Sequence, residues 1–513
     1  MSEIHFKYPI FFKEELIMST IKKMLLVVTA CVFVLALAAC GDKKNNTTTT
    51  TTPTPTTVAA ATATPTPVPD RDLKGLAVVV GDWWSGDDWQ FPTSSTADEL
   101  NSEYQHEMMK KYNYTITRKT ICGWSDQAET CLLSITSNEP LADVMTFDYR
   151  FIGAFMDQED PLFSDVATLK EFDFTDSKWN KAVVDSMTVG NAIYGFATGI
   201  EPRTGIFYNK DLVKKLLGES EVDKPYDWQA SGEWTWDKFK EFAKKLTVDS
   251  DNDGQTDIYG LITQQSVFFE MTMLSNGHAI VTKSADGSKF VNNATNSEVI
   301  EDCNWAYSFY TEGLTRRAVE GEQWNFFEDV FKQQKAVMIP YDEYKAGDFS
   351  AMEKDADGKE IGRAYDFIYG FVCFPKGPKA SNYIPVAREN IMVIPNCEVT
   401  KAKLADIAFA YNIFTDKSPE IKDDPNAWKG AYEAIFRDER SVNETLDIMI
   451  NKITPVMNPS YIIPGLWDNS TGVIQTKFFY NCDSPDQTPG QLLESLNSEI
   501  QTLIDEFNTR RAK

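Results

Sequence analysis

The sequence LAVVVGDWWSGDDW, residues 76–89, joins an apolar run to a loop of tryptophans and aspartates. Residues 76–80 are typical of a buried strand, because a short apolar run rich in valine ends at turn residues. The pattern then predicts a helix, a strand, a helix and a strand over residues 97–112, 114–117, 126–136 and 142–147. This alternation predicts an α/β fold with a parallel sheet.

Polar and aromatic residues follow the ends of two of these strands. Open α/β sheets bind ligands at the carboxyl ends of their strands, so both groups are candidates for a ligand site. They are Trp83, Trp84, Asp87 and Asp88 after the first strand, and Asp148 and Arg150 after the third. The alternatives are a solvated loop with one tryptophan packed inward, and an ordinary salt bridge at the start of a helix.

The composition favours a soluble protein that works outside the cell. The chain has 513 residues and a formal net charge of −26. This charge argues against nucleic acid and against an anionic membrane surface as partners, since both are bound through lysine and arginine. The length allows two or three lobes with their own cores.

The cysteines permit disulfides but do not indicate a zinc site. Of the eight cysteines, Cys31 and Cys40 lie in the first 40 residues, which leaves an even number of six. Cys122 and Cys131 are close in sequence and form the best local candidate for a disulfide. The three histidines form no cluster with cysteine, so zinc is not expected.

The N-terminal region has the pattern of a secretory signal. Two lysines precede an apolar run of 16 residues, 24–39, which is shorter than the roughly 20 residues that span a membrane. The run ends in Leu37-Ala-Ala-Cys40, which resembles the box of a bacterial lipoprotein signal. We therefore expect a signal peptide over 1–39, with the natural start at Met18 or Met24, and a lipid on Cys40. The alternative is an ordinary cleavage site beside an unrelated cysteine.

A threonine- and proline-rich segment, residues 40–72, follows the signal. Such a segment has little to bury and favours an extended polyproline conformation of roughly 3 Å per residue. It could therefore span up to about 90 Å as a tether between the lipid and the folded part. The alternative is a disordered tail that has no spacing role.

An aspartate-rich loop, residues 249–260, copies much of an EF-hand loop. Its candidate ligands are Asp249, Asp251, Asp253, Gln255 and Asp257, with Gly254 at the turn position. Position 12 should be a bidentate glutamate and is Gly260, so calcium would bind weakly and play a structural role. The alternative is an aspartate-rich turn without a metal.

Several motifs together resemble the extracellular solute-binding proteins of ABC importers, family 1. The resemblance extends from about residue 74 to the C-terminus, and no single motif decides it. The matching segments are Ala142-Asp-Val144, Tyr208-Asn-Lys-Asp-Leu212, Thr235-Trp-Asp-Lys-Phe239, the 249–260 loop, Lys335-Ala-Val-Met338 and Phe374-Pro-Lys-Gly-Pro378.

This resemblance implies the two-lobed periplasmic-binding-protein fold of type II, with discontinuous lobes joined by crossover hinge strands. Lobe 1 would comprise 73–202 and 376–430, and lobe 2 would comprise 203–375 and 431–513. The crossovers are expected near 200–206, 374–380 and 425–445.

The resemblance also implies a carbohydrate site in the cleft between the lobes. Aromatic rings would stack on sugar rings, and charged side chains would bind the hydroxyls. Besides the two groups already named, it adds Glu201 and Arg203 on the first crossover, Tyr341, Asp342 and Tyr344 after the 336–339 strand, and the late Trp467-Asp468 pair. The alternative for Trp467 is a packing role.

The implied function is that of a lipid-anchored receptor on the extracellular face of the cell membrane. It would bind a mono- or oligosaccharide and deliver it to an ABC transporter permease, as a monomer and without catalysis or a required cofactor beyond structural calcium. One alternative is a secreted glycan-acting hydrolase, since the chain is rich in carboxylates. Another is a sugar sensor or adhesin on the same scaffold.

Overall fold

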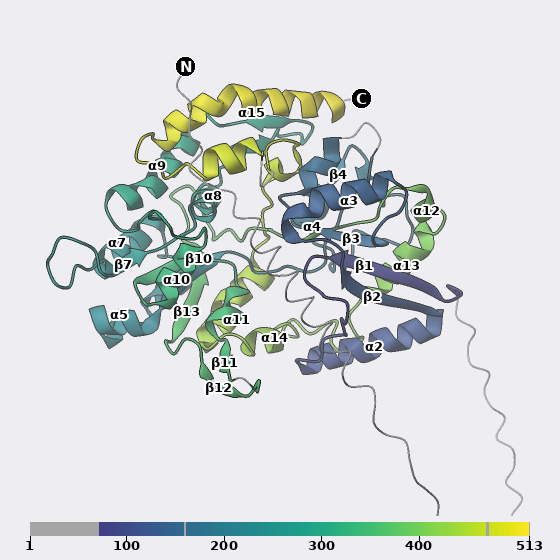
Figure 1. The fold of residues 1–513 in the computed structure, drawn as a ribbon, viewed down its shortest axis with the longest axis horizontal. Helices are drawn as coiled ribbons and strands as arrows, with labels where there is room; N and C mark the ends of the chain where they lie inside the picture. The colour runs from purple at the N-terminus through teal and green to yellow at the C-terminus, as the bar shows by residue number, and fades with distance from the viewer. Residues whose placement is uncertain (1–70, 158–160, 356, 468–470, 512–513) are drawn as a thin grey trace, which may run out of the picture. The chain divides into compact units, whose positions relative to one another are not determined.

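The computed structural model describes residues 71–157, 161–355, 357–467 and 471–511 (Figure 1). The predicted signal peptide, Cys40, Asp468 and all but the last two residues of the predicted tether lie outside the described residues. Within the described part, no helix combines the length and the apolar character that crossing a membrane requires.

The first of two four-stranded sheets has the order β14-β3-β1-β2. β1 (Leu76–Asp82) pairs in parallel with β2 (Tyr114–Thr120) and with β3 (Val144–Phe147). β14 (Ile391–Val393), from much later in the chain, runs antiparallel to β3. The α/β class and the parallel pairing of the three early strands are confirmed.

The second sheet has the order β13-β6-β10-β7 and is mixed. β10 (Ala336–Tyr341) is parallel to β7 (Tyr259–Leu261). β6 (Gly205–Asn209) runs antiparallel to both β10 and β13 (Tyr369–Cys373). These strands are buried on both faces, which explains their continuous apolar sequences.

Among the described residues, the remaining strands form three short hairpins, and helices surround the sheets (Figure 1). The hairpins are β4 (Thr188–Val189) with β5 (Ala192–Ile193), β8 (Val281–Lys283) with β9 (Phe290–Asn292), and β11 (Met352–Lys354) with β12 (Glu360–Arg363). The α-helices are α2 (Thr96–Tyr112), α3 (Gln127–Thr136), α4 (Lys181–Ser186), α5 (Lys210–Leu217), α6 (Lys224–Ser231), α7 (Trp236–Leu246), α8 (Gln265–Ser275), α9 (Ser297–Thr311), α10 (Phe326–Lys332), α11 (Lys345–Phe349), α12 (Glu398–Lys401), α13 (Leu404–Phe414), α14 (Lys429–Glu433) and α15 (Pro489–Arg511). Short 3₁₀ segments are η1 (Trp124–Asp126), η2 (Ile152–Asp157), η3 (Glu219–Glu221) and η6 (Pro459–Ile462), and π-helical segments are η4 (Ser441–Leu446), η5 (Ile448–Lys452) and η7 (Val473–Phe479).

Two helices illustrate how local sequence sets the boundaries. The side chain of Asn209 accepts a hydrogen bond from the Leu212 amide and begins α5, and Gly218, with φ of +101°, ends it. Thr235 caps α7 in the same way, by accepting from the amide of Lys238. Asparagine and threonine are both common helix caps, because their side-chain oxygens can accept from the amides of the first turn.

The chain passes repeatedly between the two sheets. Phe196 still pairs with Met392 beside the first sheet, and β6 of the second sheet begins at Gly205. After β13 the chain passes back to the first sheet, which it reaches at Ile391 in β14. Lys376, early in this connection, still pairs with Thr235 beside the second sheet. A third passage connects α13, which packs on β1 and β2, with η4, which packs on β13. The residues at which the lobes divide remain predictions.

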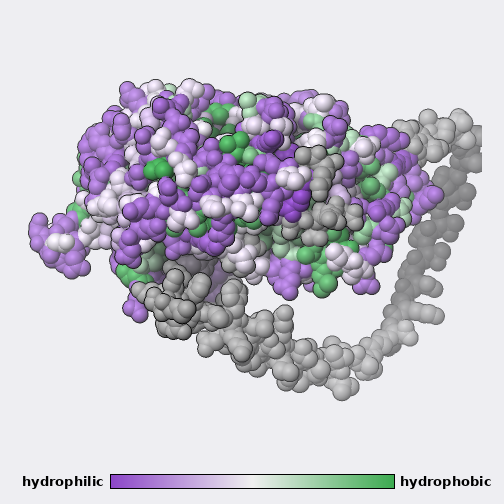
Figure 2. All heavy atoms as spheres, turned by 90° about the horizontal axis from the view of Figure 1, so that it is seen from above, coloured by the Kyte–Doolittle hydropathy of each residue, from purple (hydrophilic) through white to green (hydrophobic). Residues whose placement is uncertain are grey.

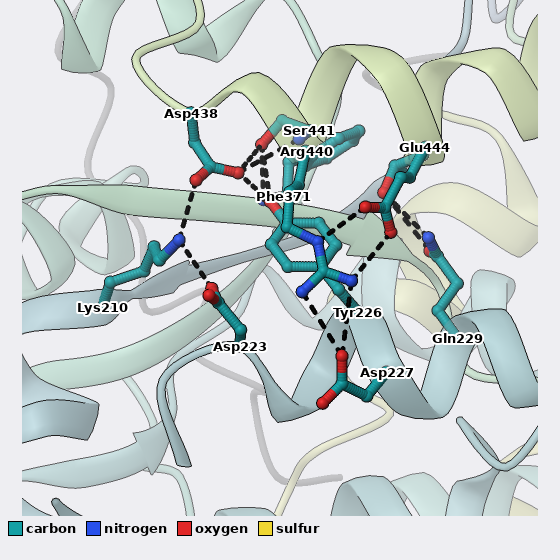
Figure 3. A network of polar contacts seen from close by, with 11 residues as sticks. Lys210, Asp223, Tyr226, Asp227, Gln229, Phe371, Asp438, Arg440, Ser441 and Glu444 are labelled. Carbon is teal, nitrogen blue, oxygen red and sulfur yellow. Dashed lines mark hydrogen bonds and ion pairs between the residues drawn. The ribbon is translucent and has the colours of Figure 1, made fainter. Parts of the chain in front are cut away.

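A polar network holds the end of this third passage against the second sheet (Figure 3). Asp438 accepts hydrogen bonds from Lys210 at 2.7 Å and from the Tyr226 hydroxyl. The Ser441 hydroxyl forms a hydrogen bond with the Tyr226 hydroxyl at 2.8 Å. The backbone amide of Phe371 in β13 donates to both of these hydroxyl oxygens. Segment 438–441 is therefore attached to α5 through Lys210, to α6 through Tyr226 and to β13 through Phe371.

The surface of the described part is mainly hydrophilic on the face drawn in Figure 2. In the face that Figure 2 shows, hydrophilic residues cover most of the described surface, and hydrophobic residues form small separate groups. Single exposed apolar side chains such as Leu133 and Val319 are ordinary on folded proteins.

Candidate functional site

The candidate site is built where β3 and β10 end and where the chain passes between the sheets. Asp148, directly after β3, is buried and forms a bidentate pair with Arg150, with N–O distances of 2.6 and 2.8 Å. Burial alone would raise the pKa of Asp148, but the charge and hydrogen bonds of Arg150 hold it below its ordinary value. Both predicted residues therefore carry their charges in a fixed orientation.

Two aromatic rings surround this pair. The indole nitrogen of Trp124 donates to Asp148 at 3.1 Å, and the Arg150 guanidinium lies 4.8 Å from the centre of its ring. The same guanidinium lies 5.1 Å from the ring of Tyr149, which packs against Tyr461 at 4.3 Å. Flat rings beside an oriented ion pair are the groups that a sugar site uses.

A second ion pair comes from the first crossover. The buried Arg203 is paired with Glu201, and its guanidinium lies 3.9 Å from Glu343, which follows β10. The half-exposed ring of Tyr344 lies 5.8 Å from the same guanidinium. Desolvation raises the pKa of Tyr344, and the charges of Asp342, Arg203 and Arg150 also act on it. Tyr344 is thus close to both predicted ion pairs.

Two carboxylates beside Arg203 are perturbed strongly. Burial raises the pKa of Glu343 to about 7 and that of Glu389 to about 8, although Arg203 acts in the opposite direction on both. Glu389 accepts hydrogen bonds from the Asn180 amide group at 3.2 Å and from the backbone of Glu201 at 3.1 Å. Perturbed groups of this kind gather at functional sites more often than elsewhere.

Arg388 forms the third charged centre. It donates to Glu270 at 2.5 Å and to Thr204 at 2.9 Å, and its guanidinium lies 3.7 Å from Asp342. The carboxylate of Glu270 also accepts hydrogen bonds from Asn458 at 2.8 Å and from Tyr461 at 2.5 Å. Arg388 therefore connects the two crossovers to helix α8.

Several buried polar atoms of this centre have no partner among the described residues. They are Nε of Arg203, Nε of Arg388 and Oε2 of Glu343. A buried polar atom left without a hydrogen bond costs about 1–3 kcal/mol, so native proteins usually supply a partner. Two donors and one acceptor at this centre are therefore available to a polar ligand or to water.

The predicted tryptophan loop lies at the end of β1, as expected, and contacts β2 and α13. The backbone amide of Gly86 donates to the Thr120 hydroxyl at 2.9 Å, and the Trp89 ring lies 6.4 Å from that of Phe414. Trp84 is 48% exposed, and its ring contacts Trp83 edge-on at 4.5 Å. Asp87 and Asp88 are exposed. No contact among the described residues joins this loop to Arg150 or Arg203, so its part in binding remains a prediction.

Tyr341 and Trp467 are less available than expected. The Tyr341 hydroxyl donates to Glu328 at 2.8 Å, and its ring faces Phe327. Trp467 is 4% exposed, packs edge-on against Tyr461 and donates to Ser460 at 2.6 Å. In this structure Trp467 has a packing role, since its faces are covered by protein.

Sequence reasoning missed seven residues of this centre, and only Tyr149 and Glu343 among them lie two residues after a strand, β3 and β10 respectively. The seven are Trp124, Tyr149, Glu270, Glu343, Arg388, Glu389 and Tyr432. Desolvation raises the pKa of Tyr432, and the charges of Glu343 and Glu389 raise it further. One signal was available: Glu270 is the one charged residue of helix α8, all of whose residues are described, and it lies among buried apolar side chains. A lone acidic residue in a buried helix requires a partner.

The aspartate-rich loop brings three of its predicted ligands together. Carboxylate oxygens of Asp249, Asp251 and Asp257 lie within 4.8 Å of one another. One oxygen of Asp249 is buried without a partner among the described residues. Asp253 is not in the group, since its carboxylate accepts from the backbone and side chain of Gln255. Asp257 accepts from the backbone amide and the hydroxyl of Ser250.

The model of the bacterial extracellular solute-binding protein family matches residues 92–411. No curated protein matches the chain significantly. The match begins just before α2 and ends within α13, and therefore includes the second sheet, every strand of the first sheet except β1, and most of the candidate site.

Solved structures show the same fold. The cyclic α-maltosyl-1,6-maltose binding protein of Arthrobacter globiformis matches with a TM-score of 0.58 and 14% identity, over 84% of this chain and 100% of that one. A sugar-binding protein of Xanthomonas citri gives 0.54 and 13%, over 85% and 98%. An ABC substrate-binding protein of Listeria monocytogenes in complex with cycloalternan gives 0.53 and 15%, over 84% and 99%. The predicted type II periplasmic-binding-protein fold is confirmed.

Proposed function

Because the chain belongs to the bacterial extracellular solute-binding proteins, we propose that it captures an oligosaccharide at the centre formed by Arg150, Arg203 and Arg388. The neighbouring structures support this ligand class, since their names specify maltose-type and cyclic sugars. No bond is made or broken. The ligand shifts the equilibrium towards the arrangement of the lobes that binds it more tightly, and the size of this shift is set by the difference in affinity between the two arrangements.

The observation that carries the proposal is the set of unsatisfied buried atoms beside exposed aromatic surface. Nε of Arg203 and of Arg388 can donate to sugar hydroxyls, and Oε2 of Glu343 can accept from one. Tyr344, half-exposed and close to Arg203, offers a face for the C–H side of a sugar ring.

The charge balance favours a neutral sugar. Each arginine of the centre already faces a carboxylate: Arg150 faces Asp148, Arg203 faces Glu201, and Arg388 faces Glu270. Asp342, whose carboxylate lies 3.7 Å from Arg388, adds a further acidic group, so an anionic ligand would meet a surplus of negative charge.

We further propose that a lipid on Cys40 and the tether keep the receptor at the extracellular face of the membrane, near an ABC permease. Because the tether holds the receptor close to the membrane, its effective concentration at the permease is high. A weak interaction between receptor and permease is then sufficient for delivery of the sugar. Replacement of Cys40 by alanine should release the protein from membrane fractions into the medium, whereas wild-type protein stays with the membrane.

Calorimetric titration with maltose, maltotetraose and a cyclic glucotetrasaccharide tests the ligand class. We expect at least one sugar to bind, to raise the melting temperature and to be recovered intact. Arg388→Lys should weaken that binding, because lysine lacks the fork of donors that arginine presents. Turnover of the sugar would instead support a hydrolase, and failure of a broad glycan panel would overturn the proposal.

We also propose that the 249–257 loop binds calcium with a structural role. The three convergent carboxylates and the unpartnered oxygen of Asp249 support it. The missing glutamate at position 12 limits the affinity to the weak range of extracellular calcium modules.

A further inference from the structure

Cys122 and Cys131 flank the segment that holds Trp124 and Gln127 against Asp148. The Cys131 thiol is near enough to lower the pKa of Cys122, which packs against the hydrophobic core that includes Cys131. Cys131 is fully buried in α3, and Cys122 is half-buried just before η1. Both cysteines are free thiols in this structure. Two neighbouring thiols in a protein of an extracellular family favour a disulfide.

The segment between the two cysteines positions an ion pair of the candidate site. Trp124 donates to Oδ2 of Asp148 at 3.1 Å, and Gln127 accepts from the Asp148 amide at 2.9 Å. Gln127 also donates to the carbonyl of Trp124 at 2.9 Å, which couples the two contacts. The Trp124 ring in turn lies against Arg150.

We propose that Cys122 and Cys131 form a disulfide that clips residues 122–131 and thereby fixes Trp124 and the Asp148–Arg150 pair for ligand binding. The part that concerns affinity rests on the proposed function. Closing so short a loop removes conformations in which Trp124 leaves Asp148. Binding then loses less entropy, because the ring is already in place.

The bond forms by thiol–disulfide exchange with an exported disulfide oxidoreductase. The Cys122 thiolate attacks the disulfide of the oxidant and forms a mixed disulfide. The Cys131 thiolate then displaces it, so the two cysteines lose two electrons and two protons in total and the oxidant leaves as a dithiol. Cys122 suits the attacking role because the neighbouring Cys131 thiol lowers its pKa and because it is the more accessible thiol.

Peptide mapping of the exported protein tests the bond directly. Trypsin releases residues 120–150 as one peptide that contains both cysteines and no other. We expect its mass to be about 2 Da below that of the dithiol peptide, without alkylation. Glu-C cuts after Glu129, between the cysteines, so the two halves should stay joined until a reductant is added. A fully alkylated peptide would overturn the proposal.

The clip has a second readout that does not need a sugar. Reduction, or the Cys122→Ser/Cys131→Ser double variant, should speed amide exchange over 123–130 several-fold and leave α13 unchanged. Cys397→Ser, a buried cysteine that contacts Thr400, is the matched control and should leave this exchange unaltered.

Maltotetraose titration completes the test. Reduction should weaken its binding about 3- to 10-fold, without loss of the folded state. A disulfide with unchanged exchange and affinity would overturn the positioning role. If no sugar binds in either redox state, the proposed function fails, whereas peptide mapping and exchange still decide the clip.

Discussion

Arg388 and Glu389 are consecutive residues whose buried side chains bond in opposite directions. Arg388 reaches Glu270 in α8, whereas Glu389 accepts from Asn180, the residue that caps α4, and from the backbone of Glu201. Residues 388–389 of the second crossover are thus attached to α8 through Arg388, and to the start of α4 and the first crossover through Glu389. This stretch is where changes of charge should have the largest effect on stability and on the relation between the lobes.

Glu389→Gln should change the pH dependence of stability. The pKa of Glu389 is about 8 in the folded protein and near 4.5 when unfolded, so the folded state binds the extra proton. Its stabilising contribution is therefore complete below about pH 4.5 and is lost as the pH rises towards 8.

Urea unfolding from pH 5 to pH 9 measures this effect. The variant should gain stability relative to wild type as the pH rises, by several kcal/mol at most, since one unit of pKa shift is worth about 1.4 kcal/mol. Glu398→Gln, at an exposed position, should follow the wild-type curve. Parallel curves for Glu389→Gln and wild type would contradict the prediction.

Glu270→Gln should destabilise the protein strongly. The change leaves Arg388 buried without its closest counter-charge, and loss of one partner of a buried pair costs about 3–5 kcal/mol. Glu499→Gln removes a half-exposed pair with Lys477 and should cost less than about 1 kcal/mol. Equal midpoints of urea unfolding for both variants would argue that Glu270 is not the counter-charge of Arg388.

Tyr344→Ala should weaken sugar binding without loss of stability. Its ring is 49% exposed beside Arg203, so its removal takes away a stacking surface but little core packing. We expect the dissociation constant to rise about 5- to 30-fold, which corresponds to roughly 1–2 kcal/mol. Trp324→Ala, which removes a ring that is 73% exposed and contacts Phe327, is the control and should bind like wild type. Equal losses in both variants would show a general surface effect.

The sequence was most informative where local rules decide the structure. The alternation of strands and helices over 76–147 and the caps at Asn209 and Thr235 follow from periodicity and side-chain hydrogen bonding, and the structure has them. Strand ends also indicated Asp148 and Arg150, because parallel strands bring their carboxyl ends to one edge of the sheet. These rules do not depend on contacts between distant segments.

The rest of the candidate site depends on such contacts. Arg388 and Glu389 lie in an extended crossover without periodicity, and their partners come from segments more than 100 residues away. Trp467 shows the opposite case: its sequence context suited a stacking residue, but Ser460 and Tyr461 cover it. Burial of that kind is a property of packing that no local pattern encodes.

Asp438→Asn should loosen the network that Figure 3 shows. The asparagine cannot balance the charge of Lys210, and its amide nitrogen cannot accept the bonds from Tyr226 and Ser441. We expect a loss of about 2–4 kcal/mol in the free energy of unfolding. Asp227→Asn, whose contact with Arg440 is longer at 3.4 Å and exposed, should cost less than about 1 kcal/mol. Similar losses in both variants would contradict the central place of Asp438.

Calcium should raise the melting temperature, and a chelator should lower it. With a dissociation constant near 10⁻⁴–10⁻³ M, calcium at about 1 mM stabilises the folded state by roughly 0.4–1.4 kcal/mol. Asp249→Asn should abolish the response, since it removes a charge from the group formed with Asp251 and Asp257. Asp286→Asn is the control, because Asp286 binds Ser284 and Ser288 in an ordinary turn. A melting temperature that neither calcium nor chelator changes would leave the loop as an aspartate-rich turn.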